Sequence, residues 1–424
     1  MTEAGWNRSI NALIVCVFCG AAAALVGVTA LGVQIYELTH REIDLGLLGL
    51  AEFAPAALLV LATGSVADRF DRTRVTSIGA AAEAIAGLGL AAYAATGPTS
   101  VLPIFGLVLV FGAGRAFMAP ALRALPADIV SAERLPWLTS RRAVAWQVAI
   151  IVGPVISGFL YAVDPVAPYL AMAAFAGIAS VSVIFVDPQR QAPRTIDAEA
   201  AAMEASVDPV GAAPVAAGRL REALEGLRFI RRSPILLGAI SLDLFAVLFG
   251  GAVALLPAIA SDRLGVGAVG LGWLRAAGGI GAAVVTLGIA RRQITRRVGR
   301  VLLLSVSVFG IATIVLGLSR SYAIAFIAMA VLSGADSISV FIRSTLVPLA
   351  TPHDKRGRVL AVESVFIGAS NELGAFESGV AGQLLGASGA VVLGGAATIL
   401  VAGYYWARFP ALRNVDHFPN TAQS

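Results

Sequence analysis

Charge is scarce in this sequence. Charged residues make up only 13% of the 424 positions, while hydrophobic residues make up 58%. A soluble protein usually carries about 25% charged residues, so this chain does not have enough charge to cover a water-facing surface. We therefore predict a membrane protein. Its fold class should be all-α, because helices satisfy their own backbone hydrogen bonds in lipid.

Cysteine and histidine are also rare. Cys16 and Cys19 lie three residues apart in the first apolar segment, and His40, His353 and His417 fall in loops or in the tail. A structural metal site needs about four ligands close together, so we predict neither a metal site nor another cofactor. Gly-Lys-Ser phosphate loops, His-Glu-x-x-His motifs and a domain large enough for ATP are absent as well. The chain is therefore not predicted to be an enzyme.

Twelve apolar segments fill most of the length. A bilayer core of about 30 Å needs about 20 apolar residues per helix, and each segment is close to that length. The predicted spans are 11–36, 45–66, 74–96, 101–124, 137–162, 166–186, 234–260, 266–290, 301–318, 321–349, 358–384 and 388–407.

The positive charges fix a predicted orientation. If the N-terminus is cytoplasmic, 25 of the 31 Lys and Arg residues fall on the cytoplasmic side, and only Arg41, Arg263 and Arg320 fall outside. An excess of basic residues in short loops marks the cytoplasmic side. We predict a multi-pass inner-membrane protein with both termini in the cytoplasm. The net charge of +5 then reflects topology and does not indicate nucleic-acid binding.

A polar stretch divides the chain into two sets of six helices. We predict an N-terminal bundle over 1–186, a cytoplasmic linker over 187–233, a C-terminal bundle over 234–410 and a cytoplasmic tail over 411–424. The first part of the linker should be flexible. The part from Arg219 onward has the pattern of an amphipathic helix on the membrane surface. Two six-helix repeats with a site between them near the midplane form a known transporter plan.

Short basic loops occur at equivalent places in the two halves. Gly64-Ser65-Val66-Ala67-Asp68-Arg69-Phe70-Asp71-Arg72-Thr73-Arg74 joins the second and third segments, and residues 288–297 join the eighth and ninth about 223 positions later. With these features the chain resembles the major facilitator superfamily, whose signature loop has Gly, Asp, Arg and a second basic pair. Asp71 stands where many members have glycine. The resemblance implies a cytoplasmic latch in which Asp68 pairs with arginines on neighbouring helices and caps a helix end. The predicted latch residues are Gly64, Asp68, Arg69 and Arg72.

Two further motifs narrow the class. Gly153-Pro154-Val155-Ile156-Ser157-Gly158 resembles the antiporter signature of the superfamily, with Ser157 replacing a glycine. Proline removes a backbone hydrogen bond and glycine allows close packing, so we predict a helix bend at Gly153, Pro154 and Gly158. Arg115 resembles the intramembrane arginine of proton-coupled drug exporters, although the glycine that usually follows is missing.

Motifs in the second half resemble the enterobactin-exporter-like branch, which includes macrolide efflux proteins. They are Gly226-Leu227-Arg228-Phe229-Ile230 before Ser233-Pro234, Leu256-Pro257-Ala258, and Thr351-Pro352-His353 followed by Gly357-Arg358-Val359.

Charged residues inside spanning helices are costly and are candidate functional residues. A carboxyl group near an arginine can bind and release a proton as its surroundings change. Some of the acids, which also include Glu52 and Glu83, should be structural partners of Arg115, Arg275 and Arg343. The predicted coupling or substrate residues are Arg115, Asp243, Asp336, Arg343, Glu363, Glu372 and Glu377.

The predicted function is secondary export of a small molecule by alternating access, with proton antiport. The substrate should be siderophore-like or an amphiphilic drug-like molecule. The expected partners are this small molecule, protons and the lipid bilayer, with no nucleic acid, and we expect a monomer. The alternative is an importer or facilitator of a small solute on the same fold.

Overall fold

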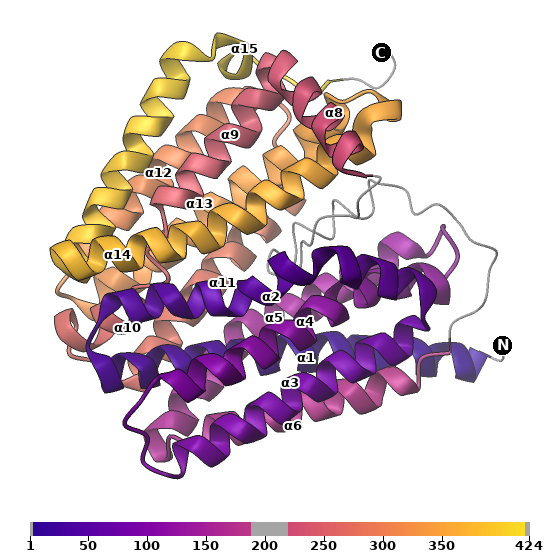
Figure 1. Ribbon diagram of the computed structural model, residues 1–424. Helices are drawn as coiled ribbons and strands as arrows, with labels where there is room; N and C mark the ends of the chain where they lie inside the picture. The colour runs from indigo at the N-terminus through magenta and orange to yellow at the C-terminus, as the bar shows by residue number, and fades with distance from the viewer. Residues whose placement is uncertain (1–2, 188–218, 420–424) are drawn as a thin grey trace. The chain divides into compact units, whose positions relative to one another are not determined.

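The computed structural model describes residues 3–187 and 219–419 (Figure 1). The predicted flexible part of the linker lies outside these residues. Throughout the described part of the chain the secondary structure is helical, without strands. The main helices are α1 (Glu3–Thr39), α2 (Glu42–Arg69), α3 (Arg72–Ala94), α4 (Leu102–Ile129), α5 (Leu135–Val163), α6 (Ala167–Ile184), α8 (Arg219–Arg232), α9 (Pro234–Phe249), α11 (Ala268–Arg291), α12 (Val298–Leu318), α13 (Tyr322–Leu349) and α14 (His353–Arg408).

The helices form two compact units. The first is built from Met1–His40, Ala51–Ala216 and Gly267–Ala276, and the second from Arg41–Leu50, Ala217–Val266 and Ala277–Ser424, each taken over its described residues. In the first unit α3 packs against α4 and α6, and α1 packs against α5 and α6 (Figure 1). Contacts between α4 and α5 are sparse, and this part of the unit contains the cavity described below.

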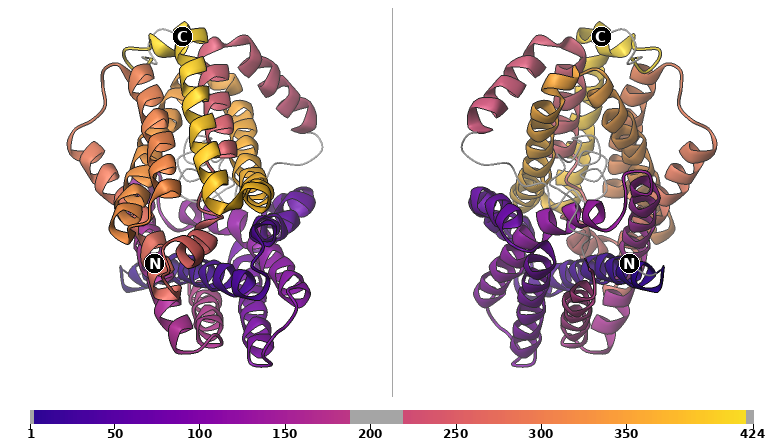
Figure 2. Two further views of the ribbon diagram at one scale, coloured as in Figure 1. Left: turned by 90° about the vertical axis from the view of Figure 1, so that its left-hand side faces the viewer. Right: turned by 90° about the vertical axis from the view of Figure 1, so that its right-hand side faces the viewer.

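The second unit has a similar arrangement. α12 packs against both α13 and α14, and α9 packs against α14 (Figures 1 and 2). Contacts of α13 with α9 and α14 are sparse. In both units, therefore, one helix (α4 or α13) makes few contacts with two helices that pack closely against each other (α1 with α5, or α9 with α14).

The number of spanning helices differs from the twelve that the sequence predicts. Nine described helices are long and apolar enough to cross a membrane, or ten if α8 and α9 form one bent span. α14 covers two predicted spans, 358–384 and 388–407, in one helical stretch. Its backbone breaks at Gly386, where φ is 74°, a conformation that glycine adopts readily and other residues rarely do. This break lies between the two predicted spans.

The predicted span 234–260 is wrong as a continuous helix. α9 ends at Phe249, and a turn leads to the short helix α10 (Leu256–Ala258) and a π-helical turn at Ile259–Arg263. The break lies at the glycine pair Gly250-Gly251, where the backbone packs closely against its neighbours. A Cβ atom on Gly250 would lie 2.4 Å from the Phe309 ring, and one on Gly251 would lie 2.5 Å from the carbonyl oxygen of Gly374.

Helix α8 meets α9 at an angle of 108°. Ser233 caps α9 by accepting a hydrogen bond from the Leu236 backbone N–H, and Pro234 occupies the first helical position, both typical of a helix start. Ile230 is buried, and Glu225 forms an ion pair of 3.1 Å with Arg358 of α14. α8 is therefore attached to the start of α14 and turns sharply away from α9.

The end of the chain is bound to the start of α12. The backbone N–H of Gly299 donates to the carbonyl of Val415 at 2.9 Å, and the backbone N–H of Arg297 donates to the Asp416 carboxylate at 3.1 Å. A short helix, α15 (Pro410–Arg413), precedes these contacts. Residues 414–416 of the predicted tail thus belong to the packed second unit.

A glycine pair in α11 tests how tightly the helices of the second unit pack. A Cβ on Gly281 would lie 1.9 Å from the Ala330 carbonyl oxygen of α13, whereas one on Gly288 would meet nothing within 4 Å. We expect Gly281→Ala to destabilise the protein by about 1–3 kcal/mol, because α13 must move away. Gly288→Ala should be neutral or slightly stabilising, because alanine favours helix. Thermal unfolding of both purified variants in detergent would show this difference, and equal midpoints would contradict the packing.

Candidate functional site

The loop between α2 and α3 consists of only two residues, Phe70 and Asp71. Both flanking helices continue to the loop, so Arg69 ends α2 and Arg72 begins α3. Arg69 is exposed. The surroundings of Gly64 and the side chain of Asp68 lie outside the described part of the structure. The pairing predicted for Asp68 therefore stays a prediction.

Asp71 is the residue that caps α3. Its carboxylate accepts hydrogen bonds from the hydroxyl of Thr73 and from the backbone N–H of Arg74, the latter at 3.0 Å. The Thr73 hydrogen bond and then the Arg74 backbone hold the pKa of Asp71 below its usual range. Asp71 therefore caps the start of α3, and the helix cap predicted for Asp68, whose side chain is outside the described part of the structure, stays a prediction. Asp71, which stands where many family members have glycine, thus serves as the N-terminal cap of α3.

The cap gives a pH-dependent prediction. Asp71→Ala should lower the stability by about 1 kcal/mol at neutral pH, the usual effect of losing an N-terminal cap. Because the folded pKa is depressed, this stabilisation is present above the ordinary pKa of about 3.9 and is lost as the pH falls through the folded value. Asp71→Asn keeps the acceptor without the charge and serves as the control. Thermal unfolding at several pH values in detergent measures both, and a pH-independent difference between Asp71→Asn and wild type would contradict the proposed charge effect.

Arg72 forms the ion pair that the structure shows at this end of the first unit. Its Nη1 atom lies 2.8 Å from Oδ1 and 2.7 Å from Oδ2 of Asp128, near the end of α4. Both side chains are less than one-third exposed. The pair ties the start of α3 to the end of α4. Sequence reasoning missed Asp128, although it follows Pro126-Ala127 in a stretch where an isolated acid is conspicuous.

A double-mutant cycle tests this pair. Arg72→Gln and Asp128→Asn should each reduce stability. The double variant should be no less stable than the less stable of the two single variants, because the same interaction is lost in all three. A partly buried pair of this geometry should show a coupling energy of roughly 1 kcal/mol or more. Arg74→Gln, on the exposed side of the same helix turn, is the matched control. Additive effects of the two substitutions would show that the residues do not interact.

Arg115 lies in the interior of the first unit with only 6% of its surface exposed. It interacts electrostatically with Glu52 of α2, as does Arg275 at the start of α11. The backbone explains this proximity, since a Cβ on Gly112 would lie 2.3 Å from the Glu52 carbonyl oxygen. Gly112 and Arg115 are three residues apart and share a helix face. Glu52 is therefore a partner of both arginines.

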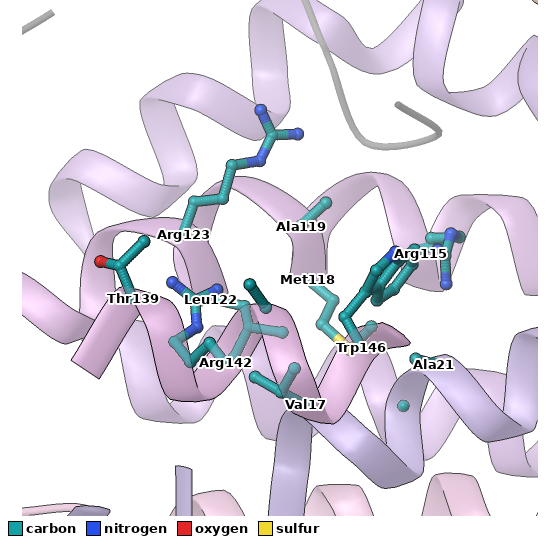
Figure 3. Close-up of a pocket in the computed structure, with 12 residues that line it drawn as sticks. Val17, Ala21, Arg115, Met118, Ala119, Leu122, Arg123, Thr139, Arg142 and Trp146 are labelled. Atoms are coloured by element: carbon teal, nitrogen blue, oxygen red, sulfur yellow. The ribbon is translucent and has the colours of Figure 1, made fainter. Parts of the chain in front are cut away.

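A cavity of about 50 Å³ lies between α1, α4 and α5. Arg115 and Arg123 of α4 and Arg142 of α5 line it, and Trp146 lies beside Arg115 (Figure 3). The Arg115 guanidinium carbon is 6.0 Å from the centroid of the Trp146 ring, within the range of a cation–π interaction. None of the described residues that line the cavity is acidic.

The positions of Arg123 and Arg142 correct the sequence interpretation. Both were counted among the cytoplasmic basic residues, although they lie within the predicted spans 101–124 and 137–162. The structure continues α4 to Ile129 and begins α5 at Leu135, so the loop is shorter than predicted and both arginines are helical. Each lies about two turns inside its helix end, or roughly 10 Å at 1.5 Å per residue. Moving these two leaves the excess of cytoplasmic basic residues large.

The motif in α5 packs against two neighbours. On one face a Cβ on Gly153 would lie 2.9 Å from the Leu25 side chain, and the buried Ser157 hydroxyl donates to the Val26 carbonyl of α1 at 2.8 Å. On the other face a Cβ on Gly158 would lie 2.5 Å from the Ala268 carbonyl oxygen, at the start of α11. Ser157 replaces a motif glycine because its hydroxyl is satisfied by α1. The bend predicted at Pro154 stays a prediction.

A cluster of charged side chains occupies the interior of the second unit. Arg343 of α13 donates to Asp243 of α9, with 2.6 Å between Nη2 and Oδ1, and both are almost fully buried. Glu363 of α14 is buried and interacts electrostatically with both members of this pair. Asp336, two turns before Arg343 on the same helix, does the same. Three helices thus contribute one carboxyl group that contacts the Arg343 guanidinium and two that interact with it electrostatically. We call Arg343, Asp243, Asp336 and Glu363 the Arg343 cluster.

Glu372 and Glu377 occupy a different part of α14. They follow Glu363 by nine and fourteen residues, which corresponds to roughly 13 and 21 Å along a helix. Glu372 lies beside Gly49, where a Cβ would be 3.0 Å from its carboxylate, and Glu377 interacts with Ser378. The five acids named from the sequence therefore do not form one group. Among the described residues, no three His, Cys, Asp or Glu side chains are arranged to hold a metal ion.

Comparison with known proteins agrees with this architecture. The family model of the Major Facilitator Superfamily matches residues 12–375. The chain belongs to this superfamily. It is therefore a multi-pass membrane transporter with the all-α major facilitator fold, as the sequence predicts.

Individual relatives are distant. The chain is 25% identical to the enterobactin exporter EntS of Shigella flexneri over 335 residues, which is 79% of this chain and 75% of that protein. A bacterial homologue of the human lysosomal transporter Spinster has a similar structure, with a TM-score of 0.70, 13% identity and coverage of 96% of this chain and 97% of the other. A D-xylose–proton symporter gives a TM-score of 0.69 with 16% identity, covering 96% and 98%. The structural likeness shows the fold alone.

Proposed function

We propose that this protein is a proton-driven exporter of a siderophore-like or amphiphilic small molecule, working by alternating access with both termini in the cytoplasm. The Arg343 cluster carries this proposal. Three carboxylates beside one guanidinium would leave excess negative charge in a medium of low dielectric constant, which is unfavourable. A bound proton reduces that excess charge, and protons on two of the three carboxyl groups would balance it. A change in solvent access during transport would then release the proton.

Within the cluster the residues have different roles. Arg343 and Asp243 form the direct pair, at 2.6 Å. Removing one partner of a buried pair leaves an uncompensated charge and costs about 3–5 kcal/mol, so this pair holds α9 and α13 together. Glu363 and Asp336 interact with the pair at longer range. They are the groups that can change protonation without breaking the direct contact.

Export as the direction rests on different support. The distant relative with 25% identity is an enterobactin exporter, and the Gly153–Gly158 motif resembles that of antiporters. The buried Arg115 in α4 resembles the arginine of proton-coupled drug exporters. The excess of basic residues in the inward loops supports the cytoplasmic position of the termini.

Transport in liposomes tests the proposal. Enterobactin and erythromycin are the probes, with membrane potential clamped and a pH step imposed so that protons flow against the exported solute. We expect the step to accelerate transport by wild type. Glu363→Gln or Asp336→Asn should abolish the acceleration, because the neutral side chain cannot exchange the proton. Asp354→Asn, at the exposed start of α14, is the matched control and should respond as wild type does.

Two outcomes would overturn the assignment. Transport that is independent of the pH step would identify a facilitator. A pH response that survives in Glu363→Gln, in Asp336→Asn and in the double variant would place proton exchange outside the Arg343 cluster. Monodisperse elution of each variant in detergent shows that a loss of response is not a loss of folding.

A further inference from the structure

The cavity between α1, α4 and α5 has an unusual composition for the interior of a membrane protein. Three arginines border about 50 Å³ of space, together with Trp146 and apolar side chains such as Met118 and Leu122 (Figure 3). Arginine inside a spanning segment is costly. Acids such as Glu52 and Glu83 lie in the same unit, but they do not line the cavity that the three arginines border.

Topology alone does not explain these arginines. A basic residue that marks the cytoplasmic side does so with an exposed side chain, as the neighbouring Arg141 of α5 has. Arg142, the next residue, is only 9% exposed and faces the cavity. Arg115 is only 6% exposed. Two of the three arginine side chains are therefore buried, and their burial costs desolvation free energy.

The guanidinium group is suited to binding oxyanions. It is planar, permanently charged and presents several N–H donors in a fork that matches a carboxylate. Arg115, Arg123 and Arg142 also interact with groups of the protein, among them Glu52 near Arg115. Besides these interactions, the three guanidinium groups border the same cavity, and none of the described side chains that line this cavity is acidic.

Size and lining restrict the ligand. The volume admits a group as large as a carboxylate or a few waters, and not a drug-sized molecule, which usually needs about 300 Å³ or more. The apolar side chains and the Trp146 ring favour a hydrocarbon or aromatic part next to the charge. A fully hydrated inorganic anion would lose solvation without gaining these contacts.

We propose that the arginine cavity is a subsite that binds the anionic group of an organic substrate, with the apolar body of that substrate against Trp146. This inference rests on the proposed function for its role in transport and names the substrate class as organic anions. The exported molecule enters the first unit by its acidic group. The second unit holds the Arg343 cluster at the equivalent meeting of helices, so the two units carry basic and acidic sites respectively.

Isothermal titration of the full-length protein in detergent tests the subsite directly. Benzoate is the probe, and benzamide is its uncharged analogue. We expect saturable benzoate binding by wild type and none by benzamide, with inorganic phosphate binding more weakly than benzoate. Arg142→Gln and Arg123→Gln should each weaken benzoate binding by at least about tenfold, the usual effect of a lost hydrogen bond to a charged group. Arg142→Lys keeps the charge and loses the forked donor geometry, so its benzoate affinity should lie between that of the Gln variants and that of wild type.

Arg141→Gln is the matched control. Arg141 stacks on Trp137 with 4.4 Å between its guanidinium carbon and the ring centroid, and it does not line the cavity. Its replacement should leave benzoate affinity unchanged. Equal binding of benzoate by wild type and Arg142→Gln, equal binding of benzamide, or no saturable binding would each overturn the proposal. Phosphate binding as tightly as benzoate would overturn the organic-anion assignment.

These experiments test the anion subsite and proton-driven export independently of each other. Titration needs neither a proton gradient nor a transported solute, so benzoate binding without pH-driven export would remove the proposed function and leave the subsite in place. Proton-driven export of enterobactin or erythromycin without benzoate binding would do the reverse. If Arg142→Gln does not elute as a monodisperse protein, Arg142→Lys and Arg123→Gln carry the test.

Discussion

A charge buried in a membrane-spanning helix must be balanced inside the protein, and the ion pair between Arg343 and Asp243 does this for the second unit. Its 2.6 Å contact joins α13 to α9, two helices whose other contacts are few. An unpaired guanidinium at this depth would cost several kcal/mol. The pair therefore adds a direct link between α13 and the closely packed helices α9 and α14, with which α13 otherwise makes few contacts.

Both units contain buried charged side chains, but basic groups predominate in the first and acidic groups in the second. In the first, three arginines border a cavity where α1, α4 and α5 meet. In the second, three carboxyl groups surround one arginine where α9, α13 and α14 meet. These helices occupy corresponding places in the two halves of the sequence. The proposed anion site therefore lies in the first unit and the proposed proton site in the second.

Much of the fold could be predicted from the sequence because lipid permits few alternatives. The hydrophobic runs gave the helices, and Gly386 and the Ser233-Pro234 start followed from local backbone rules. The break at Gly250 was missed because it depends on close approach to Phe309 and Gly374, which no local pattern encodes. The cap at Asp71 was read as a departure from a family motif, although its hydrogen bonds to Thr73 and Arg74 are local.

The candidate site was only partly predictable. Hydropathy marks Arg343, Asp243 and Glu363 as buried charges but does not say which acids share an arginine, and Glu372 and Glu377 were grouped with them for that reason. Arg123 and Arg142 lie near the ends of predicted spans and were counted only as basic residues that mark the cytoplasmic side. That both line a cavity depends on the packing of α1, α4 and α5, which the sequence does not show.

The central claim is that carboxyl groups of the Arg343 cluster take up the proton that drives transport. Infrared difference spectroscopy of the purified protein, recorded as the pH is lowered, measures this directly through the C=O stretch of protonated carboxyl groups. The account predicts a protonation band in wild type that is lost or reduced in Glu363→Gln or Asp336→Asn and retained in Asp354→Asn. An unchanged band in the double variant Asp336→Asn, Glu363→Gln would contradict it.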